Sequence, residues 1–157
     1  MDFADPDAHS PDCPNKFYQD LKKLQENNLC QIWIVRDEET PVAFMAISMG
    51  AIEVEVLGQE QAIEKTTPLE DVSTRYPAMF VVKMAVDNRY RGNGIGTKMG
   101  NFCIGLAAEI SERVACRYVA LQSPSHRVKF FKDLGFVESQ MEPTKPDDTT
   151  WMYFRMV

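Results

Sequence analysis

Hydrophobic positions recur with helical spacing in two segments of the chain. In residues 14–29, Phe17, Leu21 and Leu24 share one face, between charged residues that solvent can cover. In residues 96–115, apolar side chains again fall every three or four positions. These are Met99, Phe102, Cys103, Leu106, Ile110 and Val114. The pattern predicts two amphipathic helices that pack against a sheet.

Other segments are rich in β-branched and aromatic residues and predict strands. Residues 78–86 are apolar almost throughout, as expected for a strand buried on both faces at the centre of a sheet. A shorter helix is expected from Pro124 to Leu134. The strand–helix–strand unit between antiparallel hairpins predicts a mixed sheet with helices on both faces. Strands are expected at residues 30–36, 42–49, 52–57, 78–86, 117–122, 136–139 and 150–156.

Two segments lack a clear period. Residues 1–13 are acidic and contain prolines, so they are expected to form a flexible tail ahead of a single domain, residues 14–157. Residues 58–77 are polar, and a loop of this length is commonly functional or mobile. A short helix near residues 69–74 is expected to interrupt it.

The composition fits one globular domain, with 157 residues of which 45% are hydrophobic and 25% charged. The four cysteines have irregular spacing, which predicts reduced, mostly buried thiols and no zinc site. No apolar run reaches the roughly 20 residues of a membrane helix, and the N-terminus lacks the features of a secretory signal. A cytoplasmic protein without a membrane partner is therefore expected.

Charge is distributed unevenly along the chain. The net charge is -6, which argues against nucleic acid as a partner of the whole surface. Residues 83–98 nevertheless contain four basic side chains against Asp87 alone, a local charge of +3 that leaves -9 for the rest. A small anionic ligand is expected there.

The same segment contains a glycine-rich loop between a predicted strand and a predicted helix. Gly92, Gly94 and Gly96 allow a ligand oxygen to approach the main chain, and the N–H groups of a helix N-terminus favour an anion. The loop matches neither G-x-G-x-x-G, because Thr97 and Met99 occupy the third glycine position in the two possible registers, nor the P-loop pattern. A phosphate or pyrophosphate site is predicted, without preference for a dinucleotide or a nucleoside triphosphate.

This loop resembles a known family motif. Arg91-Gly92-Asn93-Gly94-Ile95-Gly96, preceded by Met84-Ala85-Val86, is similar to the R-x-x-G-x-G acyl-CoA motif of the GNAT superfamily of N-acetyltransferases. Residues 125–136 resemble its second motif, N-x-x-A-x-x-x-Y-x-x-x-G-F. Ser125 and Val128 stand for the usual Asn and Ala, and Phe131 stands for the tyrosine that often acts as general acid. No clear first strand precedes the first helix.

The resemblance implies an α/β (α+β) fold with a mixed central sheet of six to seven strands. It implies acetyl-CoA as co-substrate, in a cleft where residues 78–86 separate from residues 117–122. Backbone groups of Met84 and Val86 would pair with pantetheine, and the N–H groups of residues 92–97 would hold the pyrophosphate. The binding residues implied are Met84, Ala85, Val86, Arg91, Gly92, Asn93, Gly94, Ile95, Gly96, Thr97, Ser125 and Phe131.

The activity implied is direct acetyl transfer from acetyl-CoA to a primary amine of a small molecule, peptide or protein. A protonated amine must first lose a proton, so a base is expected. Glu53 and Glu55 are the candidate bases, with His126 as a further possibility, although strand-face glutamates are also commonly only solvated. No metal is expected, and a homodimer is a tendency of the family.

Two alternatives are open. Asp12-Cys13 before a helix, residues 46–52 and residues 82–86 also resemble the toxin branch of the family, which acetylates aminoacyl-tRNA. That branch usually keeps the tyrosine and displays a basic surface, whereas this chain has Phe131 and an acidic balance. The other alternative is a non-catalytic acyl-CoA sensor, which the absence of the tyrosine would allow.

Overall fold

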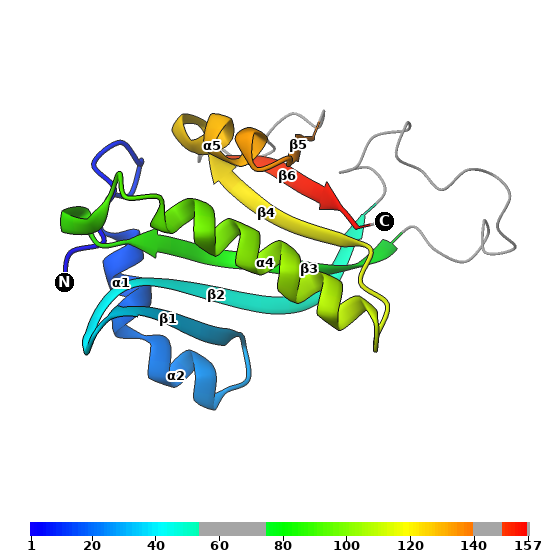
Figure 1. The fold of residues 1–157 in the computed structure, drawn as a ribbon, viewed down its shortest axis with the longest axis horizontal. Coiled ribbons are helices and arrows are strands. Elements are labelled where there is room, and N and C mark those ends of the chain that lie inside the picture. The colour runs from blue at the N-terminus through cyan, green and yellow to red at the C-terminus, as the bar shows by residue number, and fades with distance from the viewer. Residues whose placement is uncertain (54–74, 140–148, 157) are drawn as a thin grey trace, which may run out of the picture.

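The computed structural model describes residues 1–53, 75–139 and 149–156, and the expected strand end at residues 54–57 and the helix near residues 69–74 lie outside them. Figure 1 shows one curved sheet with helices on either side. The elements are α1 (Cys13–Gln19), α2 (Leu21–Glu26), β1 (Gln31–Asp37), β2 (Thr40–Glu53), β3 (Arg75–Val86), η2 (Asn88–Tyr90), α4 (Ile95–Ser111), β4 (Tyr118–Pro124), η3 (Ser125–Arg127), α5 (Val128–Asp133), β5 (Val137–Glu138) and β6 (Thr149–Arg155).

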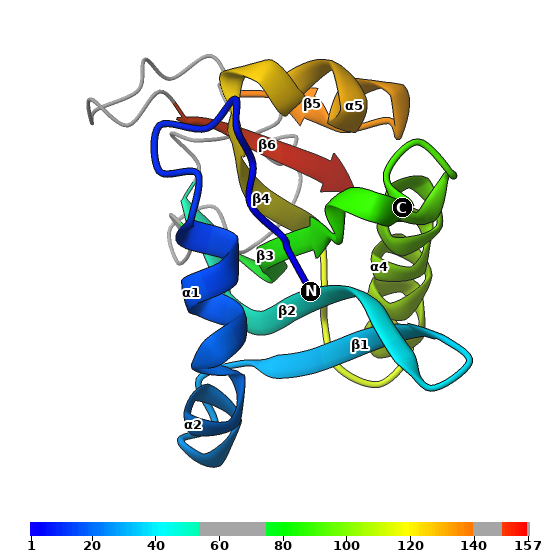
Figure 2. The ribbon, with the colours of Figure 1, turned by 90° about the vertical axis from the view of Figure 1, so that its left-hand side faces the viewer.

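The sheet has six strands in the order β1-β2-β3-β4-β6-β5. Only the β3–β4 pair is parallel, because α4 carries the chain across the sheet between them. Figure 2 shows α1 and α4 on opposite sides of the sheet. The predicted mixed α+β architecture is confirmed. No described helix is both long and apolar enough to cross a membrane.

Two local features differ from the predictions. The first helix is divided at Asp20 into α1 and α2. The expected strands at residues 42–49 and 52–57 are parts of one strand, β2, which continues through Gly50. A Cβ at Gly50 would lie 2.9 Å from the Phe80 ring, so this glycine lets the ring of the neighbouring strand pack over β2.

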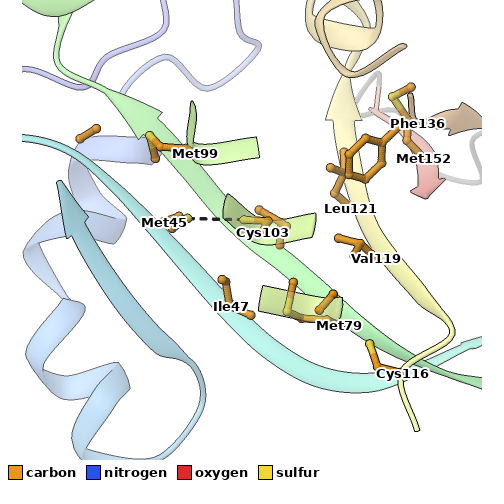
Figure 3. Packing of buried hydrophobic residues seen from close by; sticks show 13 residues of the cluster. Met45, Ile47, Met79, Met99, Cys103, Cys116, Val119, Leu121, Phe136 and Met152 are labelled. Carbon is orange, nitrogen blue, oxygen red and sulfur yellow. Dashed lines mark hydrogen bonds between the residues drawn. The ribbon is translucent and has the colours of Figure 1, made fainter. Parts of the chain in front are cut away.

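The main core lies between the sheet and α4 (Figure 3). Met99, Cys103 and Ala107 of α4 pack on Met45 of β2 and Met79 of β3, and the Cys103 Sγ lies 3.4 Å from the Met45 Sδ. Met99 and Cys103 belong to the predicted apolar face, whereas Phe102 and Val114 of that face are exposed, and Val114 lies beyond the end of α4. All four cysteines are free, and Cys30, Cys103 and Cys116 are buried, whereas Cys13 is half-buried.

The N-terminal segment, residues 1–12, packs on the body of the protein, in contrast to the flexible tail that was predicted. Phe3 is fully buried, with its ring centroid 4.8 Å from Tyr18 and 5.1 Å from Phe44. The Phe3 N–H donates to Asn15 Oδ1 at 2.7 Å, and the Asn88 N–H donates to the Asp2 carbonyl at 2.8 Å. The acidic, proline-containing composition gives no sign that one aromatic residue, Phe3, anchors the segment.

Replacement of that anchor tests whether the segment is docked. We expect Phe3→Ala to lower the free energy of unfolding by about 3 kcal/mol, because it removes a fully buried ring. Urea denaturation measures the change. Leu29→Ala is the control, since Leu29 is exposed and its loss should cost less than about 0.5 kcal/mol. Equal, small effects of both substitutions would mean that residues 1–12 are a free tail.

Candidate functional site

The central feature of the site is a gap between β3 and β4. The two strands pair only from Ala78 to Phe80, opposite Tyr118 to Ala120. Beyond Phe80, β3 stays paired with β2 while β4 stays paired with β6, and no further pair joins β3 to β4 among the described residues. Backbone groups on the β4-facing edge of β3 are therefore free to bind a ligand.

A cavity of about 850 Å³ occupies this gap. That volume lies in the usual range for small-molecule and cofactor sites. Its walls come from β3, β4, the glycine loop, α5 and the N-terminal segment. Of the residues expected to bind the acyl donor, the lining includes Met84, Ala85, Val86, Arg91, Gly92, Gly94, Ile95, Gly96, Thr97 and Phe131, whereas Asn93 and Ser125 are not among the lining residues.

The glycine loop ends at the N-terminus of α4, beside the cavity. Gly92 and Gly94 have φ angles of +80° and +74°, which favour glycine, and a Cβ at either position would meet nothing within 4 Å. Gly94 is the N-cap of the 17-residue α4, and no side chain caps the first turn. The first N–H groups of a long helix are thus left for an anion.

Hydrogen bonds of a buried carboxylate and of two arginines hold the loop in place. The Asp87 side chain is fully buried and accepts from the Arg89 guanidinium at 3.0 Å and from the Arg89 N–H at 2.9 Å. These bonds hold the pKa of Asp87 far below its usual range, although burial opposes them. The Arg91 guanidinium donates to the carbonyls of Val86, at 3.2 Å, and Ala4, at 2.7 Å. Arg91 therefore fixes the backbone around the cavity.

The N-terminal segment links the two sides of the gap. Asp5 accepts from His126 Nε2 at 2.9 Å and from Arg127 Nη2 at 3.1 Å, while Ala4 binds Arg91 on the other side. Burial by itself would raise the pKa of Asp5, but the hydrogen bonds from His126 and Arg127 outweigh it, so the pKa lies below its usual value. Residues 1–12 thus join the glycine loop to the start of α5.

The second motif fits the structure in a register different from the one first assigned. Phe131 and Arg127 both line the cavity, one helical turn apart, and Pro124 lines it as well. Counting the motif back from Phe131 at the tyrosine position places Arg127 and Pro124 at the Ala and Asn positions, instead of Val128 and Ser125. The Phe131 ring lies 5.0 Å from that of Phe130 and 5.7 Å from that of Phe136. It supplies packing and carries no proton to donate.

Of the candidate bases, Glu53 and His126 are described by the structure, and neither is among the residues that line the cavity. Glu53 forms an exposed ion pair with Arg75 at 3.0 Å, at the end of the β2–β3 hairpin farthest from Val86. Six residues of extended strand separate Arg75 from Val81, where the cavity lining on β3 begins, or about 20 Å. Glu55 lies outside the described residues. His126 contacts Asp5 and is not among the lining residues.

Several lining residues were missed by the sequence analysis. They include Asp5, His9, Cys13 and Gln122, while Lys83 was counted only as part of the basic segment of residues 83–98. Only Lys83 carried a sequence signal, as the one charged residue in the apolar run of residues 78–86. Among the described residues, no three His, Cys, Asp or Glu side chains are grouped to hold a metal ion.

The chain is similar to one protein family and to several solved structures. A family model described as an acetyltransferase (GNAT) domain matches residues 28–138. No curated protein sequence matches the chain. Among solved structures, a bacterial toxin has a TM-score of 0.77 at 18% identity, over 95% of this chain and 80% of that one. AtaT complexed with acetyl-methionyl-tRNAfMet has a TM-score of 0.71 at 15% identity, over 87% and 79%. AtaTR bound with acetyl-CoA gives 0.67 at 16%, over 99% and 87%.

The cysteines allow a test of the cavity. Burial raises the pKa of the Cys30 and Cys116 thiols and that of Cys103 to about 11, whereas Cys13 is half-buried and lines the cavity. We expect iodoacetamide near pH 8 to alkylate Cys13 at least about tenfold faster than the other three, because the thiolate reacts. Peptide mass spectrometry measures the rates, and Cys13→Ser is the control. Equally fast alkylation of Cys103 in the folded protein would contradict the structure.

Proposed function

The chain belongs to the GNAT family of acetyltransferases, and from that premise we propose that it transfers an acetyl group from acetyl-CoA to an amine. The observation that carries the proposal is the cavity between β3 and β4, with the glycine loop at one end. A cavity open along a strand edge and closed by an anion site suits a long ligand with a phosphate end and a polar amide arm.

The residues present fit acetyl-CoA as the donor. The open space beside Gly92 and Gly94 and the uncapped N-terminus of α4 suit a pyrophosphate. The edge of β3 that β4 leaves unpaired, from Met84 to Val86, offers backbone groups to the amides of pantetheine, although the Val86 carbonyl already accepts from Arg91. Bound acetyl-CoA supplies the activated acetyl thioester, and the chain binds and orients it.

The lining of the cavity restricts the acceptor. Its one carboxylate among the described residues is Asp5, which is engaged by His126 and Arg127 and has a lowered pKa, so it is a weak base. His9, exposed at the edge, is another side chain there that can accept a proton. An acceptor that is already partly neutral is therefore favoured. An α-amine, with a pKa of about 7.7–8.0, is roughly one third neutral near pH 7.5, against roughly one thousandth of a lysine ε-amine.

The acceptor class that we favour is the α-amine of aminoacyl-tRNA. The structures of AtaT with acetyl-methionyl-tRNAfMet and of a bacterial toxin support it through their shared fold. Lys83, Arg91 and Arg127 give the cavity three cations against one carboxylate, a local charge suited to the phosphates of a nucleic acid end. We therefore withdraw the expectation that nucleic acid is not a partner, and aminoacyl-tRNA becomes our first choice of acceptor.

A second candidate is the α-amine of a small molecule or peptide. The specific observation in its favour is the net charge of -6, with -9 outside residues 83–98. Such a surface repels the phosphate backbone of an RNA away from the cavity. A small acceptor that lies wholly within the cavity would not meet this repulsion.

An acceptor panel distinguishes these functions. Acetyl-CoA turnover would be measured with charged tRNA, amino acids, N-terminal peptides, lysine peptides and polyamines. We expect charged tRNA to be acetylated with the highest kcat/KM, and α-amines to exceed ε-amines by at least about tenfold, because of their lower pKa. Faster acetylation of free amino acids or peptides than of charged tRNA would support the second candidate. Binding of acetyl-CoA without turnover of any acceptor would favour a sensor.

Donor binding is tested at Gly94. We expect Gly94→Asp to weaken acetyl-CoA binding at least about tenfold, because it places a negative charge at the anion site. Gly94→Asn is the matched control: it has the same size and tolerates a positive φ equally well, but carries no charge. Isothermal titration calorimetry measures both affinities, and circular dichroism checks the fold. Equal affinities of the two variants would mean that the pyrophosphate lies elsewhere.

A further inference from the structure

Lys83 lies at an irregular position of β3. In the pairing of β2 with β3, Ala46 is opposite Lys83 and Ile47 is opposite Val81, so Val82 is an extra residue in β3. Such a bulge changes the direction of the side chains that follow it. Lys83, directly after the bulge, is half-buried and lines the cavity.

The contacts of the Lys83 ammonium are with neutral groups. Its Nζ donates to Cys13 Sγ at 3.1 Å and lies 5.9 Å from the centroid of the Phe17 ring. Within the described part of the chain, no carboxylate forms an ion pair with Lys83. Asp5, the carboxylate of the cavity lining, is already paired with Arg127 and His126.

Lys83 is also on a different face of the sheet from the glycine loop, which leads into α4. Its contacts, Cys13 and Phe17, belong to α1, and Figure 2 shows α1 on the side of the sheet opposite α4. Along β3, Lys83 precedes Val86 by three residues, or about 10 Å, before the chain turns into the loop. The cavity therefore has two cationic regions, one at each side of the gap.

We propose that Lys83 binds an oxyanion of the acceptor, a carboxylate or a phosphate close to the amine that receives the acetyl group. This inference rests on the proposed function, because it assigns the donor phosphates to the glycine loop and the acceptor to the α1 side. Gln122 and Thr149 add polar side chains to the cavity lining from β4 and β6.

The physical basis is the cost of an unpaired charge. A half-buried ammonium without a counter-ion is poorly solvated, and an anion beside it restores a charge-assisted hydrogen bond. The same ammonium repels an acceptor with a second positive charge, so Lys83 disfavours polyamines as it favours anionic α-amines. It acts as a specificity-determining residue.

The kinetic test compares acceptors with and without a negative charge near the amine, each measured with the wild-type protein and with the variant. Methionine is compared with methionine amide, and methionyl-tRNA with methionyl-adenosine, which lacks the phosphate. One of these pairs will contain acceptors that the protein acetylates. For the anionic member of that pair, we expect Lys83→Met to lower kcat/KM at least about tenfold. For the neutral member, we expect a decrease of less than about twofold. Lys83→Arg should recover most of the loss. Lys16→Met, an exposed lysine on α1 outside the cavity, should change neither.

A second measurement does not depend on turnover. The alkylation rate of Cys13 reports on the space beside Lys83 Nζ. We expect N-acetylmethionine or 3′-O-(N-acetylmethionyl)-AMP to slow alkylation at least about threefold in the wild-type protein, and the neutral amide or adenosine ester to have little effect. The difference should disappear in Lys83→Met. Protection of Cys13 by N-acetylmethionine would identify a carboxylate site. Protection by the AMP ester would identify a phosphate site.

The outcomes are separable. If no acceptor is acetylated but an anionic probe still protects Cys13 through Lys83, the anion site stands and the proposed function falls. If Lys83→Met weakens acetyl-CoA binding in calorimetry and lowers kcat/KM equally for charged and neutral acceptors, Lys83 belongs to the donor site and the inference is overturned. Protection that is equal for anionic and neutral probes also overturns it.

Discussion

The extra residue at Val82 shifts the register of β3 against β2 just after the pairing of β3 with β4 has ended at Phe80, and the functional geometry depends on that point. One side of β3 must remain bonded to β2 after the bulge, because the register from Ala43 to Ala46 continues up to Val86. The other side can no longer follow β4, which pairs instead with β6 through Pro124. A parallel pair of only three residues therefore opens into a cavity with a free strand edge.

Strands that separate must be held apart at a fixed distance, and here the N-terminal segment does this. Phe3 anchors the segment in the core on the α1 side, and from there Ala4 binds Arg91 and Asp5 binds Arg127. These contacts join the loop after β3 to the helix after β4. Buried Asp87 fixes the loop from within, since its carboxylate has two bonds from the Arg89 side chain. The cavity is thus braced by polar bonds between segments distant in sequence.

The sequence predicted the parts of this structure that obey a local period or a local motif. The helical face around Met99 and Cys103, the apolar central strand and the glycine loop ahead of a long helix all follow from spacing and residue type. The docking of residues 1–12 could not be predicted, because one aromatic residue in an acidic segment gives no periodic signal. The place of Glu53 could not be predicted either, since alternation fixes the face of a strand but not its distance from a site.

The proposed chemistry is consistent with the absence of a hydroxyl at Phe131. A thiol has a pKa of about 8.5, so a departing thiolate is tolerable near neutral pH, and a general acid contributes only about 10²- to 10⁴-fold. An α-amine, with a pKa near 8, also needs little help to become neutral. The pKa values of both groups then lie close to the pH of the solution, so water can carry both protons. What the chain must still supply is position, and Lys83 on one side of the gap and the glycine loop on the other would hold acceptor and donor with the bulge between them.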